Sequence, residues 1–435
     1  MPALEDTIWW HVYPLGAVGA PARREHPQAQ PAEGDQADDG SAEHRLLRLV
    51  PWLDHVVDLG CDGLLLGPIF ESVSHGYDTL DHLRIDPRLG TEDDWDSFVV
   101  EARRRGLRIL LDGVFNHVSV EHPLVARTLA EGHGPVRTLE RDGHRIPRPW
   151  EGHPSLAELD HSSPEVEDLV VEVMLHWLRR GADGWRLDVA YAVPSDFWAR
   201  VLPRVRAEFP EALFLGEVIH GDYTEIARAG TLEAVTQYEL WKGIWSSLVD
   251  RNLWELAWAL QRHEEFAAQT LMQTFVGNHD VTRIATTVGP ERAALAVVLL
   301  LTLPGMPSIY YGDEVGLLAE KGASWDADLP LRPELPGSPA ELLGGPDGRG
   351  DSGGTDGGEH GRRLLDLHRE LIRLRREHPW LTRGHVEVLD RTNETITYRV
   401  AGAGGDAGRV LEVDLHVDGR ARVVVGGAER LVVQP

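Results

Sequence analysis

The sequence contains very little lysine and cysteine. Lys242 and Lys321 are its only lysines, and with Lys+Arg 43 against Asp+Glu 70 the formal net charge at pH 7 is −27. A chain this acidic repels phosphate backbones, so we expect no nucleic-acid partner. The one cysteine, Cys61, excludes an internal disulfide, and its apolar neighbours predict a buried thiol.

Long apolar runs and a basic leader are absent as well. The longest apolar run, residues 293–303, ends at Pro304 and is too short to span a bilayer. The first residues lack the basic region and apolar stretch of a signal peptide. We therefore expect a cytoplasmic protein without a membrane partner, and nothing in the sequence indicates its oligomeric state.

The chain is long and apolar enough to form a large folded domain. Its 435 residues are 42% hydrophobic, which is sufficient for a core. Short β-rich apolar runs alternate with helical patterns, which favours parallel βα units over a sandwich. We predict an α/β fold, a (β/α)8 TIM barrel. Its strands are expected at residues 8–13, 63–66, 108–114, 184–189, 212–217, 234–238, 273–276 and 308–311.

The segment before the fourth strand shows the helical signal most clearly. Ser163 can cap a helix, Pro164 suits its first position and Gly181 can end it. Apolar side chains recur between them at helical spacing. This pattern predicts a helix that packs one apolar stripe on the core.

Three stretches break the alternation. Residues 20–43 and 334–361 are polar and rich in Gly, Pro or acidic residues, so we expect flexible surface loops there. Residues 117–162 have no strong period and would form a protrusion after the third strand. After a helix ending near Glu377, the tail from His385 alternates apolar and polar residues, which predicts antiparallel strands. The predicted units are a barrel at 1–117 and 163–380, a protrusion at 118–162 and a small C-terminal β domain at 381–435.

Polar residues follow four of the predicted strands, where the reactive side chains of an α/β barrel stand. Arg186 and Asp188 are two residues apart on one strand and point the same way. The arginine would favour the ionised carboxylate. Each residue alone is more often a satisfied structural group than a catalytic one. Buried charges on four strand ends are costly, however, unless they are used. The set is Asp112, Asn116, His117, Arg186, Asp188, Glu217, Asn278, His279 and Asp280.

Four segments resemble the conserved regions of the α-amylase family of retaining glycoside hydrolases. They are residues 112–117, 181–188, 216–218 and 276–280. One such segment would be a weak signal, whereas four in matching order and spacing are specific. The resemblance covers nearly the whole chain and implies a barrel that acts on α-glucosidic bonds.

The resemblance also implies roles by position. Asp188 would be the nucleophile, Glu217 the acid/base, and Asp280 the group that stabilises the transition state. Double displacement with retention requires Asp188 and Glu217 to lie about 5–5.5 Å apart. The side chains that would support the sugar in the cleaving subsite are Arg186, His117 and His279.

Two further segments resemble binding elements of the family. Residues 75–79 resemble its second-loop signature, in which Tyr77 would stack on the sugar between His75 and Asp78. Within the family the sequence is most similar to neopullulanases and cyclomaltodextrinases. Asp328 and Arg332 resemble the pair that lines the outer sugar site of that group.

Departures from the family pattern also carry information. The N-terminal β domain of the neopullulanase group is not expected, because the first barrel strand begins near residue 8. Ile219 stands where the group has tryptophan, and Tyr191 and Ala192 stand where many endo-acting α-amylases have Lys-His. Leaving-group recognition is therefore expected to differ. No cofactor is required, although Asn116 resembles a calcium ligand whose partners cannot be identified.

The leading hypothesis is hydrolysis of α-1,4 bonds in soluble maltooligosaccharides or related α-glucans. Val189 resembles the residue of enzymes that also accept α-1,6 bonds. A transglycosylase or isomerase of the same family, similar to trehalose synthase, would share the covalent intermediate and is the alternative.

Two other classes remain as hypotheses. A barrel metallohydrolase is disfavoured because such sites need paired histidines on the first strand, and only His11 lies there. The ligands in that case would be His117, His279, Asp112 and Asp280. A sugar-binding protein without turnover is disfavoured because all three family carboxylates are present.

Overall fold

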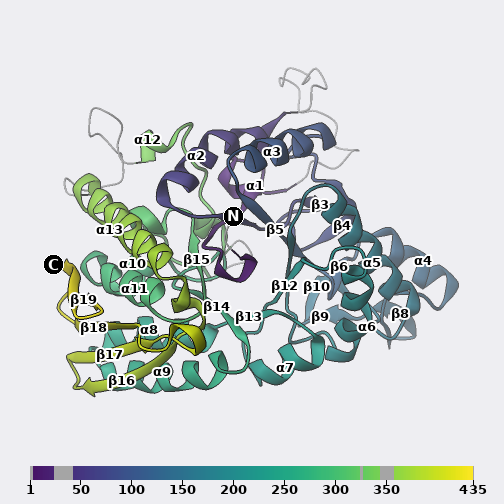
Figure 1. Ribbon diagram of the computed structural model, residues 1–435. Coiled ribbons are helices and arrows are strands. Elements are labelled where there is room, and N and C mark those ends of the chain that lie inside the picture. Colours follow the sequence, from purple (N-terminus) through teal and green to yellow (C-terminus); the bar gives the residue numbers. More distant parts are fainter. Residues whose placement is uncertain (1–2, 24–42, 324–326, 343–356, 435) are drawn as a thin grey trace.

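A closed barrel of eight parallel strands forms the centre of the computed structural model, which describes residues 3–23, 43–323, 327–342 and 357–434 (Figure 1). The predicted TIM barrel is confirmed, and all eight predicted strands are present. Around the barrel they run β1 (Trp9–Val12), β15 (Met306–Tyr310), β14 (Leu271–Phe275), β13 (Ala234–Thr236), β12 (Leu213–Gly216), β11 (Gly184–Leu187), β5 (Arg108–Gly113) and β2 (Gly63–Leu66).

Apolar side chains fill the barrel interior below the polar strand ends. Because side chains alternate along a strand, every second residue points inward. The resulting cluster is separate from the larger core between strands and helices, and its members are at most 5% exposed. It consists of Trp9, Leu65, Leu110, Leu213, Leu215, Ala234, Leu271 and Met306.

Helices cover the outside of the barrel, as the βα alternation predicts. Among the described residues the longer ones are α2 (Val50–Leu59), α3 (Glu92–Arg104), α5 (Pro164–Arg179), α6 (Ser195–Arg206), α7 (Tyr223–Gly230), α8 (Tyr238–Asp250), α9 (Leu253–Ala267), α11 (Pro290–Thr302) and α13 (Gly357–Glu377). No helix in this part of the chain is long and apolar enough to cross a membrane.

The helix predicted before the fourth strand is α5. Ser163 is its N-cap residue and Pro164 occupies its first turn, both as predicted, although the Ser163 side chain makes no capping hydrogen bond. Gly181 follows its end with φ 101°, a left-handed conformation that glycine adopts without strain. A Cβ at Gly181 would also lie 2.5 Å from Val99 Cγ1.

The protrusion after β5 is more regular than its sequence indicated. A three-stranded antiparallel sheet contains β6 (His117–Ser119), β10 (His153–Glu158) and β9 (Pro149–Trp150). A helix, α4 (Pro123–Glu131), and a hairpin of β7 (Thr138–Arg141) and β8 (His144–Pro147) complete it. Strands of two to six residues are too short to show a clear hydrophobic period, which is why the sequence did not reveal them.

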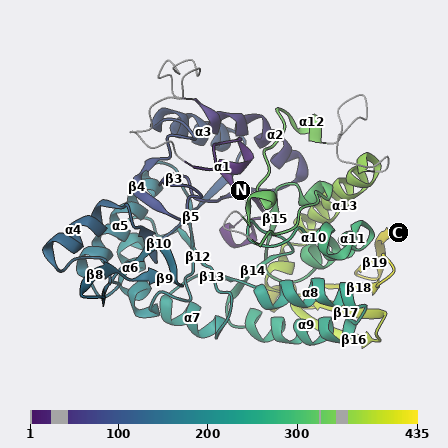
Figure 2. The same cartoon turned by 180° about the vertical axis from the view of Figure 1, so that it is seen from behind.

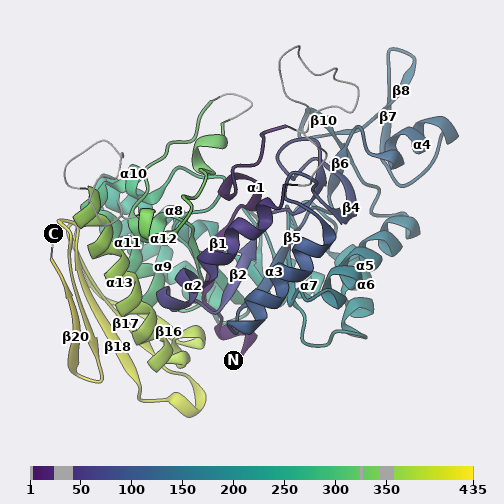
Figure 3. The same ribbon diagram turned by 90° about the horizontal axis from the view of Figure 1, so that it is seen from above.

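The tail forms the predicted antiparallel sheet, in the order β16 (His385–Arg391), β17 (Thr395–Ala401), β18 (Val410–His416), β19 (Arg420–Val425) and β20 (Ala428–Val433). Helix α9 packs against β16, as the view from behind shows (Figure 2). This sheet and the protrusion lie on opposite sides of the barrel (Figure 3). The division into domains at the predicted boundaries stays a prediction.

The predictions for the cysteine and for the two flexible loops have different outcomes. Cys61 is buried, as predicted, and burial raises the pKa of its thiol. Most of the two expected flexible loops, residues 24–42 and 343–356, lies outside the described residues.

Arg375 of α13 connects the last helix to the barrel. Its side chain is 3% exposed, and burial lowers its pKa to about 10. Nη1 donates to the carbonyl oxygens of Leu301 at 3.2 Å and Leu303 at 2.8 Å, and Nη2 donates to that of Gly305. These carbonyls belong to the end of α11 and the turn into β15, where the last carbonyls of a helix have no partner within the helix.

We expect Arg375→Met to lower the free energy of unfolding by about 2–4 kcal/mol, because three carbonyls would lose their buried donor. Urea denaturation measures this change. The matched control is Arg373→Met, which removes an exposed arginine from the same helix and should change stability by no more than about 0.5 kcal/mol. Equal losses in both variants would contradict this role of Arg375.

Candidate active site

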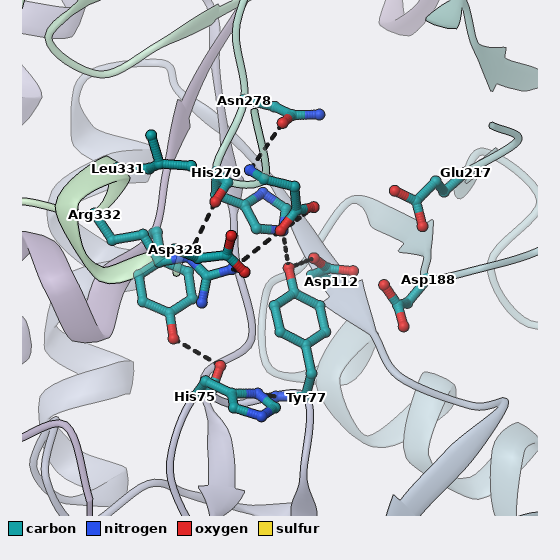
Figure 4. A network of polar contacts seen from close by, with 12 residues as sticks. His75, Tyr77, Asp112, Asp188, Glu217, Asn278, His279, Asp328, Leu331 and Arg332 are labelled. Carbon is teal, nitrogen blue, oxygen red and sulfur yellow. Dashed lines mark hydrogen bonds and ion pairs between the residues drawn. The ribbon is translucent and has the colours of Figure 1, made fainter. Parts of the chain in front are cut away.

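The C-terminal ends of four barrel strands bring the predicted residues together. Arg186 lies beside Asp112 in the register of β11 with β5, and Asp188 follows β11 directly. Glu217 follows β12, and residues 278–280 follow β14. Figure 4 shows the carboxyl groups of Asp188 and Glu217 side by side at this edge of the barrel.

One guanidinium contacts three carboxylates. Arg186 Nη1 lies 2.6 Å from Asp112 Oδ1 and 2.8 Å from Asp188 Oδ1, while Nη2 lies 2.6 Å from Glu217 Oε1. All four side chains are at most 8% exposed. One positive charge cannot neutralise three buried carboxylates, so the cluster favours the binding of a proton.

The pKa values of the cluster follow from that imbalance. Burial raises the pKa of Asp188 well above its usual value, although Arg186 opposes the shift. Burial raises the pKa of Asp112 to about 6, again against the effect of Arg186. Arg186 favours the ionised form of both carboxyl groups, as expected, but desolvation has the larger effect on their pKa values.

Glu217 is fixed by two further contacts. Its Oε2 accepts a hydrogen bond from the backbone N–H of Val189 at 2.9 Å, and its Oε1 accepts one from the hydroxyl of Tyr238 at 3.1 Å. Val189 has φ 40°, a strained value for a β-branched residue. The strained backbone directs its N–H at the carboxylate.

Tyr238 is a site residue that the sequence analysis missed. Its hydroxyl also accepts a hydrogen bond from Asn278 Nδ2 at 2.9 Å, so it connects the loops after β13 and β14. Tyr238 is the first residue of α8 rather than the last of the sixth strand. Its position beside a strand end was the available signal, but its apolar ring favoured a core residue.

Tyr77 lies inside the site, as predicted. Its hydroxyl donates to Asp112 Oδ2 at 2.8 Å, and its ring stacks on His279 with centroids 5.4 Å apart and planes 6° apart. His117 Nε2 donates to the carbonyl of Tyr77 at 3.1 Å, and its ring stacks on Trp150 of the protrusion. Burial lowers the pKa of His117 to about 3, so the ring is neutral at physiological pH.

His75 and Asp78 shape the loop around Tyr77. The carbonyl of His75 accepts a hydrogen bond from the hydroxyl of Tyr13 at 2.6 Å. Both carboxylate oxygens of Asp78 accept hydrogen bonds from Ser74, at 3.0 Å from its N–H and 2.6 Å from its hydroxyl. Asp78 is thus turned into its own loop and away from the carboxylate cluster.

Asp280 occupies the opposite side of the site and is 34% exposed. Its Oδ1 lies 3.0 Å from Arg332 Nη2, and its Oδ2 lies 3.0 Å from His279 Nε2. Asp328 Oδ2 lies 3.2 Å from the same Nη2 of Arg332. The predicted outer pair of Asp328 and Arg332 is therefore formed (Figure 4). Arg332 also joins this pair to Asp280.

Asn116 connects β5 to the protrusion, and a calcium ion at this residue stays a prediction. Its amide nitrogen lies 3.2 Å from His117 Nδ1, and its carbonyl accepts a hydrogen bond from Leu159. In the described ranges, no three His, Cys, Asp or Glu side chains form a group that could hold a metal. The metallohydrolase hypothesis therefore has no site to support it in this part of the chain.

We expect Arg186→Met to lower the free energy of unfolding at pH 7 by about 3–5 kcal/mol, because it leaves buried carboxylates without a cation. The native pKa values of Asp112 and Asp188 would rise further above their unfolded values. Native protein would then bind more protons than unfolded protein between pH 5 and 7, so the loss should shrink as pH falls.

Urea denaturation at pH 5 and pH 7 measures this dependence. Arg283→Met is the matched control, since Arg283 is also fully buried but pairs with a single carboxylate, that of Asp313. Its pH dependence should be less steep. A loss in Arg186→Met that grows toward pH 5 would contradict the charge imbalance inferred here.

Comparison with known proteins agrees with this geometry. Residues 46–140 and 150–330 match the family described as alpha amylase, catalytic domain. A cyclomaltodextrinase from Geobacillus thermopakistaniensis is 27% identical over 458 residues, which cover 97% of this chain and 72% of that protein. Neopullulanase 2 from Thermoactinomyces vulgaris is 32% identical over 357 residues, 77% of this chain and 56% of that protein.

A solved structure is similar over most of its length. Cyclic α-maltosyl-(1→6)-maltose hydrolase from Arthrobacter globiformis, in complex with maltose, aligns with a TM-score of 0.73 at 27% identity. The alignment covers 94% of this chain and 91% of that one. The predicted similarity to neopullulanases and cyclomaltodextrinases is confirmed, and the chain belongs to the α-amylase family.

Proposed function

We propose that this protein is a retaining α-glycoside hydrolase that cleaves α-1,4 glucosidic bonds in soluble maltooligosaccharides or related α-glucans, with α-1,6 bonds as further substrates. The observation that carries the proposal is the pair of buried carboxyl groups of Asp188 and Glu217, which both contact the guanidinium of Arg186 at the C-terminal end of the barrel strands. Retaining glycosidases use two such carboxyl groups, one ionised and one protonated.

The proposed reaction has two steps. Glu217 donates a proton to the glycosidic oxygen while Asp188 attacks the anomeric carbon, so that the leaving sugar departs and a covalent glycosyl-enzyme forms. Glu217, now a carboxylate, then takes a proton from water as that water displaces Asp188. Two displacements restore the original α configuration.

The charge imbalance around Arg186 suits this cycle. A single guanidinium beside three carboxyl groups favours retention of one proton in the cluster. The proposed reaction starts with that proton on Glu217 and with Asp188 ionised, beside Arg186. The N–H of Val189 and the hydroxyl of Tyr238 both donate to Glu217, which orients its carboxyl group. Arg332 holds Asp280, which in this proposal binds sugar hydroxyls.

The relatives support the substrate class. Their names include a cyclomaltodextrinase and a neopullulanase, and the similar solved structure holds maltose. Each of these observations concerns a protein at most 32% identical to this one.

The leaving-group side differs from the family pattern at positions that the structure leaves accessible. Ile219, two residues after Glu217, is 40% exposed. Tyr191 packs against His220, with ring centroids 4.7 Å apart. Since these side chains border the proposed acid, they are where linkage preference would be set.

A substrate panel tests the proposal. The purified protein is incubated with maltose, maltooligosaccharides, cyclodextrin, pullulan, isomaltose and trehalose, and products are resolved by size and anomer. We expect α-anomeric glucose or maltose from at least one α-1,4 substrate. β-Anomeric products would overturn retention, and products longer than the substrate or isomeric with it would favour transfer.

Substitution of the two carboxylates separates their roles. We expect Asp188→Asn to lower kcat about 10⁴-fold or more, because no covalent intermediate can form. Glu217→Gln should lose about 10²–10⁴-fold on maltooligosaccharides, but much less in the first step on an aryl glycoside whose leaving group needs no proton. Full activity of Asp188→Asn would refute the mechanism.

Tyr238→Phe tests the added site residue. Loss of its hydroxyl removes a donor to Glu217 and should lower kcat roughly 10-fold. Tyr398→Phe is the matched control, because it removes another buried hydroxyl, bonded to Thr302 at 2.6 Å and remote from the site. Both variants should lose similar stability, measured by thermal denaturation, and only Tyr238→Phe should lose activity.

A further inference from the structure

His11 lies at the bottom of the site and takes no part in the proposed reaction. It stands on β1, is 6% exposed, and packs on Tyr310 with ring centroids 5.1 Å apart. Its Nε2 lies 3.3 Å from Nδ1 of His279, 268 positions away in the sequence. The two rings meet edge to face, with centroids 5.1 Å apart and planes at 81°.

The contacts of His279 determine which of its nitrogens carries hydrogen. Tyr77 has one hydroxyl hydrogen and donates it to Asp112 Oδ2 at 2.8 Å. The contact between the Tyr77 oxygen and His279 Nε2 must then use a hydrogen on the imidazole. Asp280 Oδ2, an acceptor 3.0 Å from the same Nε2, requires that hydrogen as well. His279 is therefore protonated on Nε2.

The opposite nitrogen must then be an acceptor. Burial, with Arg332 and Arg186 adding to it, lowers the pKa of His279 well below its usual value, so the ring is neutral and carries a single N–H. Burial and His279 lower the pKa of His11 in the same way. A neutral pair whose His279 Nδ1 is bare forms a hydrogen bond only if His11 donates from Nε2.

We propose that His11 is a positioning residue, which donates its Nε2–H to His279 Nδ1 and thereby holds the Nε2–H of His279 toward Tyr77 and Asp280. The catalytic consequence rests on the proposed function, because Asp280 is the group assigned there to the transition state. The hydrogen bond itself does not.

The space beside the two histidines is small. A cavity of about 20 Å³ borders both histidines, beneath the carboxylate cluster. That volume is close to the minimum for one water molecule. Besides the two histidines, the polar side chains of the lining are those of Arg186, Glu217, Thr236, Tyr238, Gln273 and Asn278. His11 Nε2, at 3.3 Å, is the side-chain nitrogen that contacts His279 Nδ1 directly.

Two variants separate the hydrogen bond from the packing. His11→Gln keeps an N–H near the position of Nε2, whereas His11→Leu keeps the bulk and removes the donor. His263→Leu is the matched control, since His263 is 0% exposed on α9 and donates from Nε2 to the carbonyl of Pro304 at 3.0 Å, outside the site.

The first measurement is made without substrate. Long-range ¹H–¹⁵N NMR of histidine-labelled protein reports the protonated nitrogen of each ring, with His279 assigned from a His279→Gln spectrum. We expect Nε2–H on both His11 and His279. His11→Leu should move the Nδ1 resonance of His279 toward that of a nitrogen with no donor, and His11→Gln should not.

The second measurement is steady-state kinetics on the best substrate of the panel. We expect kcat of His11→Leu to fall roughly 10-fold with little change in KM, and His11→Gln to recover most of it. His263→Leu should retain the wild-type kcat. Equal kcat in His11→Leu and wild type would overturn the positioning role.

The outcomes are distinguishable from failure of the proposed function. Hydrogen on Nδ1 of His279 in the wild-type protein would overturn the hydrogen bond whatever the enzyme does, and needs no variant to fold. The predicted tautomers together with an absence of turnover on every glucan would leave the hydrogen bond intact and refute the function.

Discussion

The polar end of the barrel depends on the guanidinium of Arg186. It holds carboxyl groups from three neighbouring parts of the barrel, those of Asp112, Asp188 and Glu217, at 2.6–2.8 Å. Buried ions lose hydration and repel one another when they carry the same sign, so these groups would oppose folding without a shared cation. The register of β11 between β5 and β12 places Arg186 where it can contact all three.

The same interaction connects stability to chemistry. Burial raises the pKa values of Asp188 and Asp112. The single cation, Arg186, is not enough to offset this effect for three carboxyl groups. Burying carboxyl groups with too few cations lowers the free energy of unfolding. The strained backbone of Val189 lowers it further. The proposed acid/base cycle uses the proton that this cluster retains, which gives a reason for a cluster that packing alone would not favour.

The barrel strands and the carboxylates at their ends were predictable from the sequence, whereas some side-chain contacts of the site were not. The strands were predictable because apolar periodicity depends on local sequence, and the carboxylates were predictable because they end those strands. The hydrogen bonds from Ser74 to Asp78 were not predictable, since a loop can turn a side chain inward or outward without any change in pattern. Tyr238 was missed because its hydroxyl matters only once β12 and β14 bring Glu217 and Asn278 beside it.

By itself, the sequence determined the barrel, the order of its strands and the polar residues at their ends, because these follow from hydrophobic period and from positions along one strand. Only the tertiary structure decided how those residues share charge and hydrogen. One arginine serves three carboxylates, and His11 meets His279 across the closure of the barrel. Such contacts depend on distances of a few ångströms between residues far apart in the chain, and no local pattern encodes those distances.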